Sequence, residues 1–269
     1  MLKALTTAHW GKAKETLLTT YKTITLPLIE YANTVWSPNT SDTNINKLQT
    51  IQNTALRTVT GCTLDTNKEH LHTETLTLPI KQHLQLHASQ YRQMALHPEH
   101  PLHQYTLQDT NPRHKKQTIF DNNNGYTYNL DTAPQNTTED TIKENKKNIH
   151  TRIVQTYTQT LRNKILNAPP PLIAGSEKTL THSIRRTLAQ RRTNKSPLLH
   201  SYLHKINPTT YTTPGCPLCQ HHIHDTAHLF SCPQMPTALS PEDLWRNPIG
   251  AGELVEAWRV AVEAGVDAA

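Results

Sequence analysis

The chain has 269 residues, but only 35% of them are hydrophobic and only two are Phe, which argues against one large core and favours several modest helical units with polar connections. The formal charge is +6 and the isoelectric point is near 9.1, so we expect an anionic partner, nucleic acid first, although an ordinary basic surface would give the same charge. No apolar run approaches the roughly twenty residues that span a bilayer, which predicts an intracellular protein of the nucleus or cytoplasm with no membrane partner.

Apolar residues recur at helical spacing through the N-terminal part of the chain. This spacing predicts a helix over 12–36, which Pro27 should kink or divide. A second helix is expected over 42–61, and a longer one is expected to begin at Pro79. The fold class is therefore predicted to be mainly α, with a helical unit over 1–103.

The next range, 104–148, is rich in Asn, Thr, Asp and Lys and has no sustained periodicity. Such a composition predicts a flexible polar connector. Helical spacing resumes in 149–213, which we interpret as a basic helical segment. Residues 237–269 change to an Ala-, Glu- and Val-rich composition and are predicted to form a separate C-terminal helical tail.

The basic helical segment has a stripe of apolar residues at steps of four, formed by Leu180, Ile184 and Leu188. Most of its cations lie off that stripe and are expected on solvent-facing surface. They are Arg185, Arg186, Arg191, Arg192 and Lys195. Either a phosphate-binding face or an ordinary solvated face explains them.

Three of the four cysteines gather in "CPLCQHHIHDTAHLFSC", within the range 214–236. They form the pattern C-x2-C-x8-H-x3-C, whose members are Cys216, Cys219, His228 and Cys232. A Cys3His set favours one Zn²⁺, and four protein ligands leave no position for a catalytic water, so the site is expected to be structural. The competing interpretation, a redox centre, lacks the expected strand that feeds a helix.

Other histidines of the loop compete with His228 as ligands. His221, His222 and His224 are each close enough in sequence, but His228 alone has the H-x3-C spacing to Cys232. Phe230, with Leu218 and Ile223, can either stack on bases or pack under the metal. The fourth cysteine, Cys62, is expected to be buried and inert.

No catalytic motif accompanies the cysteine cluster. The sequence has no phosphate loop, nucleophile elbow, H-E-x-x-H or dinucleotide fingerprint, and its carboxylates are scattered. We therefore expect neither an enzyme nor a small-molecule substrate. The sequence does not predict an oligomeric state.

Four segments in order resemble the C-terminal part of non-LTR, LINE-type retrotransposon reverse transcriptases, jockey-like elements especially. They are "KETLLTTYKTITLPLIEYANTVWSP", "LQTIQNTALRTVTGC", "RRTLAQRRTNKSPLLHSYLHKINP" and "CPLCQHHIHDTAHLFSCPQMPTALSPEDLWRNP". The resemblance implies a thumb and connection region followed by a zinc knuckle that binds RNA or single-stranded DNA.

The resemblance does not extend to the catalytic palm of that family. The palm, with its F/Y-x-D-D signature, would lie upstream of Met1, and no endonuclease domain is present either. Only the four knuckle ligands therefore transfer from the family as site residues. We expect a binding fragment of an RNA-directed DNA polymerase, or else a protein-interaction knuckle or a remnant of a truncated element without function.

Overall fold

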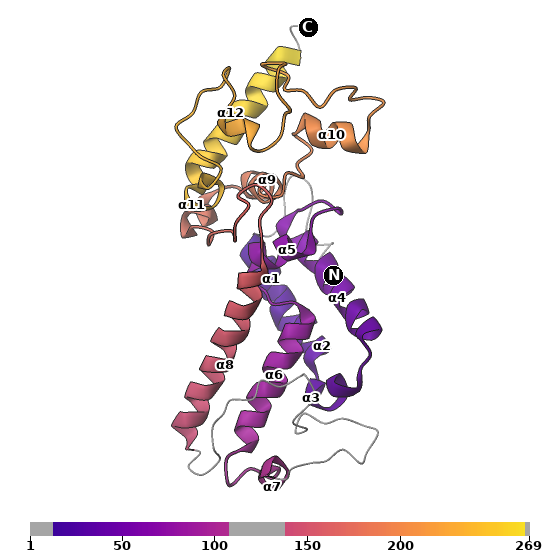
Figure 1. Ribbon diagram of the computed structural model, residues 1–269, viewed down its shortest axis with the longest axis vertical. Coiled ribbons are helices and arrows are strands. Elements are labelled where there is room, and N and C mark those ends of the chain that lie inside the picture. The colour runs from indigo at the N-terminus through magenta and orange to yellow at the C-terminus, as the bar shows by residue number, and fades with distance from the viewer. Residues whose placement is uncertain (1–12, 108–137, 267–269) are drawn as a thin grey trace. The chain divides into compact units, whose positions relative to one another are not determined.

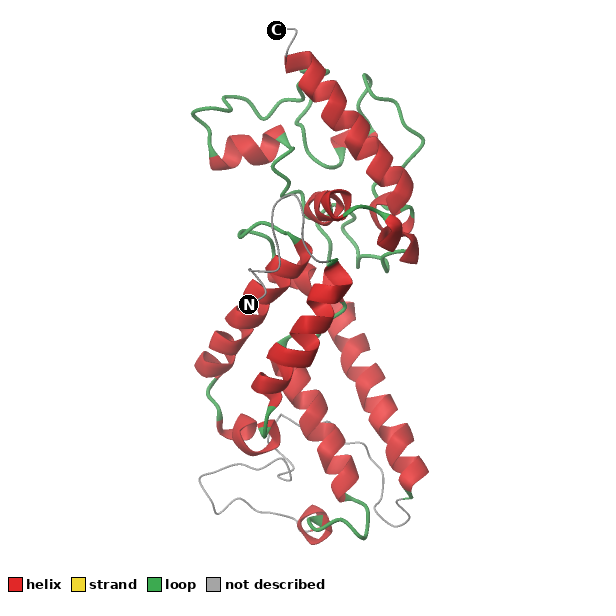
Figure 2. Ribbon diagram, turned by 180° about the vertical axis from the view of Figure 1, so that it is seen from behind, coloured by secondary structure: helices red, strands yellow, loops and turns green. Residues whose placement is uncertain are grey.

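The computed structural model describes residues 13–107 and 138–266, most of which are helical (Figure 1). The predicted mainly α fold is confirmed. Within these residues the β structure is limited to two isolated bridges, Asn163 with Ala168 and Gly215 with Ile223, and Figure 2 draws no strand. No helix of the described ranges combines the length and the apolar character needed to cross a bilayer.

The chain divides into two compact units. One, which we call the knuckle unit, contains the described residues of 13–19, 55–76 and 161–266. The other, which we call the helical unit, contains those of 20–54, 77–107 and 138–160. The predicted range 1–103 thus contributes to both units, because segments distant in sequence pack together.

The chain enters the helical unit within a helix that runs without a gap from Lys14 to Glu30 and is not divided at Pro27, although its hydrogen-bond pattern changes just before that residue. A π-helical turn, η2 (Tyr21–Thr25), follows α1 (Lys14–Thr20) and leads into α2 (Leu26–Glu30). Pro27 is the second residue of α2, but Thr25 before it is also helical, so the proline lies inside a continuing helix and interrupts its hydrogen-bond pattern. The helix does not continue to Trp36, because Ala32 is left-handed with φ of 50°.

The remaining helices of this unit are α3 (Asn33–Trp36), η3 (Ser37–Asn39), the first part of α4 (Asp42–Thr60), α6 (Ile80–Ala95), α7 (His103–Leu107) and α8 (Glu139–Thr160). Helices α6 and α8 lie side by side, as both views show (Figures 1 and 2). Their shared core contains the buried side chains of Leu78, Leu86, Ile149 and Ile153.

Helix α8 begins at Glu139, inside the range predicted as a connector. Glu139 and Asp140 are acidic residues in its first turn, which the positive end of the helix stabilises. Thr138 Oγ1 accepts a hydrogen bond from the Thr141 amide at 3.3 Å. The prediction of a flexible connector is therefore wrong for 139–148, and most of the rest of it, 108–137, lies outside the described residues.

The knuckle unit contains shorter elements. They are most of α1, the end of α4, α5 (Lys68–Thr75), η5 (Gly175–Thr179), α9 (His182–Arg191), α10 (His200–Ile206), η6 (His228–Phe230), α11 (Asp243–Arg246) and α12 (Pro248–Val266). One of its hydrophobic clusters contains Leu199, Tyr202, Leu229 and Trp258 together with the three clustered cysteines. A second contains Leu188, Leu244, Trp245, Ala251 and Val255.

Helix α12 belongs to this core, and the prediction of a separate tail is wrong. Ala251, Val255 and Trp258 recur at helical spacing and are buried. Gly252 lets α12 approach α9, since a Cβ there would come within 2.9 Å of the Ile184 side chain. A larger residue at position 252 therefore requires the Ile184 side chain or one of the two helices to move.

Candidate metal centre

A tight turn presents the first two candidate ligands. Cys216 N donates to His222 O at 2.8 Å, and Gln220 N donates to Cys216 O at 2.9 Å. Gln220 lies in the left-handed region with φ of 59°, directly after Cys219. This reversal of the backbone lets two cysteines three positions apart face one another.

The fold brings all four predicted ligands together. One donor atom from each of Cys216, Cys219, His228 and Cys232 lies within 4.8 Å of the other three, and all four residues are buried. Cys219 Sγ and His228 Nε2 are 3.4 Å apart, close to the separation of two ligands around one tetrahedral ion. The cluster can therefore hold one metal ion, and its donors are compatible with zinc.

The surroundings of the cluster shift the pKa values of two of its cysteines in opposite directions. Burial raises the pKa of Cys219, but hydrogen bonds from the His221 and His222 amides outweigh it, and the net pKa is lowered. Burial raises the pKa of Cys216 to about 11. A coordinated ion removes thiol protons outright, so Cys216 ionises when the metal binds.

Of the four histidines in the loop, only His228 joins the cluster. His221 and His222 are exposed. His224 is buried, accepts a hydrogen bond from the His200 amide at 3.1 Å, and stacks on Trp258 with 5.2 Å between ring centroids. Burial lowers the pKa of His224 to about 3, so its role is that of a neutral packing residue.

Hydrogen bonds connect the loop that carries the four candidate ligands to neighbouring segments of the knuckle unit. Asp225 Oδ1 accepts from the His228 amide at 2.9 Å, which orients the ligand-bearing turn. Thr226 N donates to Asn194 Oδ1 at 2.8 Å, and the Trp258 indole donates to Leu229 O at 3.3 Å. The candidate metal centre is therefore part of a larger core and not a free-standing module.

The structure corrects the prediction that the arginines of α9 face solvent. Arg192 is fully buried and forms ion pairs with Glu74 and Glu177. Arg185 is buried as well and pairs with Glu15. These two guanidinium groups are occupied by carboxylates inside the unit, so they cannot neutralise phosphates.

The other predicted binding residues are also partly withdrawn from solvent. Arg191 is buried, and burial lowers its pKa to about 9. Arg186 is half-buried with its side chain against Gly61, and Lys195 is half-buried in an ion pair with Asp65. Phe230 packs against both hydrophobic clusters of the knuckle unit, which favours the core role over base stacking.

Other cations, which were not predicted as binding residues, lie around two hollows of the knuckle unit. Arg162 and Lys164 are exposed and line a hollow of about 180 Å³ that also includes Lys195. Lys164 and Lys195 also line a neighbouring hollow of about 340 Å³, together with the exposed Lys205. The segment "LRNKIL" indicates the exposure of these cations, because Arg162 and Lys164 alternate with Leu161 and Asn163, both of which are buried.

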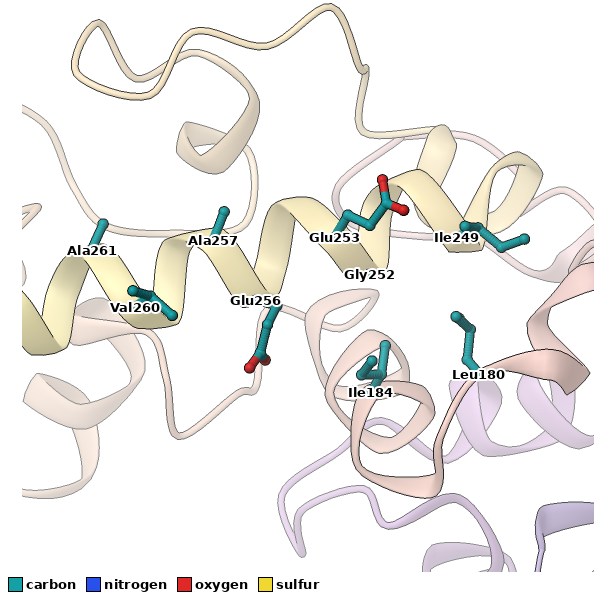
Figure 3. Close-up of a pocket in the computed structure, with 9 residues that line it drawn as sticks. All are labelled: Leu180, Ile184, Ile249, Gly252, Glu253, Glu256, Ala257, Val260 and Ala261. Atoms are coloured by element: carbon teal, nitrogen blue, oxygen red, sulfur yellow. The ribbon is translucent and has the colours of Figure 1, made fainter.

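A third hollow of the knuckle unit, about 650 Å³ in volume, is mainly apolar (Figure 3). It lies between α12 and the start of α9. Leu180 and Ile184 form one side, and residues of α12 form the other. It contains two carboxylates, Glu253 and Glu256, but no cation, so it does not extend the basic surface.

Comparison of the chain with protein-family models, with curated proteins and with solved structures gave no match. The features of the chain that bear on its function are the ligand cluster, the cations around the two basic hollows and the ordered segments of the sequence.

Proposed function

We propose that this chain binds RNA or single-stranded DNA through a zinc knuckle and an adjoining basic surface, as a non-catalytic C-terminal part of a LINE-type reverse transcriptase. The observation that carries the proposal is the closed Cys3His cluster, with four buried donors within 4.8 Å of one another. The resemblance of four ordered segments supports the family.

Zinc is the ion that this donor set favours. Soft thiolates with one imidazole are typical of structural Zn²⁺ sites, and the four protein ligands complete a tetrahedron. When bound, the ion would hold the loop closed and would stabilise the folded unit. His228 has its pKa lowered by burial, which keeps its imidazole neutral and able to coordinate.

The basic hollows are the surface that we assign to phosphate. Lys164 and Lys195 line both hollows, while Arg162 and Lys205 extend the surface on either side. Single-stranded nucleic acid is bound mainly by such charge, together with stacking on side chains that are free to contact bases. Among the three stacking candidates, Ile223 is the exposed one, at 58%.

A salt series tests the assignment of the partner. Filter binding of a single-stranded RNA and of a DNA of the same sequence to the full zinc-loaded chain should give affinities that fall linearly with salt on logarithmic axes. Arg162, Lys164 and Lys205 together predict a slope of about −2, since each phosphate contact to a single strand contributes about 0.7.

A second candidate function is a knuckle that contacts protein. The burial of Arg185, Arg191 and Arg192 favours it, because these cations are withdrawn from any nucleic acid. It predicts weak binding in the salt series and no steep slope. Primer extension with magnesium tests the non-catalytic assignment, and measurable extension by the isolated chain would refute it.

A further inference from the structure

We propose that the helical unit carries a second metal site, made by Glu30, His83 and His87, which binds a divalent transition ion such as Zn²⁺ with an open coordination position. This inference is independent of the proposed function. It concerns residues of α2 and α6 that neither the cysteine cluster nor the basic surface uses.

The geometry places three donors around one point. His83 and His87 are four positions apart on α6, so their rings project from the same face of the helix. Glu30 Oε1, at the end of α2, lies 2.8 Å from His83 Nδ1 and 3.6 Å from His87 Nε2. The three donor atoms lie within 4.8 Å of one another.

The closest pair of atoms is not hydrogen-bonded. Glu30 Oε1 and His83 Nδ1 are both buried, and neither has a hydrogen-bond partner in spite of the 2.8 Å between them. Buried polar atoms without partners are rare and destabilising. A cation between the donors would satisfy both atoms at once, because each would direct a lone pair at the ion instead of at the other.

The donor set and its exposure indicate the class of ion. Two imidazoles and a carboxylate are a set that zinc uses when a fourth position is left for water, and tetrahedral bonds of about 2.0–2.1 Å separate ligands by about 3.4 Å. The 3.6 Å contact already matches this separation, and the 2.8 Å contact needs a small movement of Glu30. The His87 side chain is 38% exposed, which gives the ion a path to the site.

Zinc stoichiometry of the full chain tests the site. We expect two zinc ions per chain, and we expect one to be lost in the His83→Gln/His87→Gln variant and in Glu30→Gln, which keeps the side-chain volume. His150→Gln, an exposed histidine on α8, is the matched control and should retain both ions. If the double variant and Glu30→Gln fold with unchanged circular dichroism and still bind as much zinc as the original chain, the site does not exist.

Cobalt distinguishes this site from the cysteine cluster. Co²⁺ bound by thiolates gives an intense charge-transfer absorption, whereas imidazole and carboxylate ligands give only weak visible bands. Cys216→Ser/Cys219→Ser should abolish the intense absorption and leave the weak bands, and the His83→Gln/His87→Gln variant should do the reverse. Loss of the entire cobalt spectrum in Cys216→Ser/Cys219→Ser would overturn the second site, while weak bands alone in the unsubstituted chain would support it and argue against the knuckle.

Discussion

Nη1 of Arg192 lies 2.8 Å from Oε1 of Glu74, with both side chains almost completely removed from solvent. Nη2 of the same guanidinium pairs with Glu177, and its Nε donates to Leu244 O at 2.9 Å. One side chain at the end of α9 therefore joins α5, η5 and α11. Lys14, 2.7 Å from Glu74, adds a second cation to this buried network.

Arg192→Met should destabilise the chain strongly. The substitution keeps an unbranched side chain but leaves Glu74 and Glu177 short of a buried partner, a change that typically costs about 3–5 kcal/mol. Urea unfolding of the zinc-loaded chain and of the variant measures this decrease in the free energy of unfolding. Arg186→Met, at a half-buried position that forms no ion pair with another described residue, should lower the free energy of unfolding clearly less, and equal losses in the two variants would contradict the role of the network.

The position of Arg192 shows which part of the fold periodicity indicates and which part it does not. Leu180, Ile184, Leu188 and Arg192 continue one stripe at steps of four, so the register itself places the arginine on the buried side. An arginine is buried only when carboxylates meet it. Glu74 and Glu177 are distant in sequence, and no local pattern indicates that the chain brings them to it.

The cluster of candidate metal ligands, in contrast, could be predicted, because the C-x2-C and H-x3-C spacings confine four donors to one short loop. The exposed cations that we assign to phosphate could not. Their prediction used charge density along the sequence, which does not distinguish buried arginines such as Arg185 from exposed cations such as Arg162. The predicted boundaries of helices were wrong where the residues of the first turn determine the start of the helix, as at Glu139, where α8 begins.

Gln220→Gly should stabilise the knuckle. A left-handed backbone costs a non-glycine residue about 1–2 kcal/mol, and Gln220 is exposed with φ of 59°, so removing its side chain loses little packing. We expect a gain of up to about 1 kcal/mol after the added freedom of the unfolded chain is subtracted. Thermal unfolding with saturating zinc measures it.

The control for this substitution is Gln234→Gly. Gln234 is also exposed but does not have a positive φ, so the same change should be neutral or destabilising there. If both variants lose stability equally, the left-handed turn after Cys219 does not strain the chain.

Stability should fall as the pH drops from about 6.5 to about 4. Burial lowers the pKa of His70 to about 4, and its Nε2 lies 3.1 Å from Ala189 O. The His70 imidazole takes up a proton near pH 6.5 in the unfolded chain, but only near pH 4 in the folded chain. The contribution of His70 is therefore complete above pH 6.5 and is lost across this window.

His70→Gln removes the titration, so its stability should depend less steeply on pH between 6.5 and 4. Urea unfolding of both proteins at one fixed zinc concentration makes the comparison, since any acid loss of zinc affects the two alike. Parallel pH profiles would show that His70 is not held neutral by the fold.

Arg162→Gln and Lys164→Gln should each weaken RNA binding and reduce the magnitude of the salt slope by about 0.7. Both side chains are exposed at the hollow that we assign to phosphate. Lys178→Gln removes an exposed cation of the same unit that lines neither basic hollow, and it is the matched control. A slope reduced equally by all three substitutions would indicate only a diffuse charge effect.

The affinity of the full chain for single-stranded RNA, measured with and without an intact metal centre, tests the central claim most directly. The comparison uses Cys219→Ala, which removes a ligand, and Cys62→Ala, which removes a buried cysteine outside the cluster. The account predicts that zinc-loaded wild type and Cys62→Ala bind RNA with a salt slope of about −2, and that Cys219→Ala binds at least about tenfold more weakly. Equal affinity in all three proteins, or an affinity that does not change with salt, would contradict it.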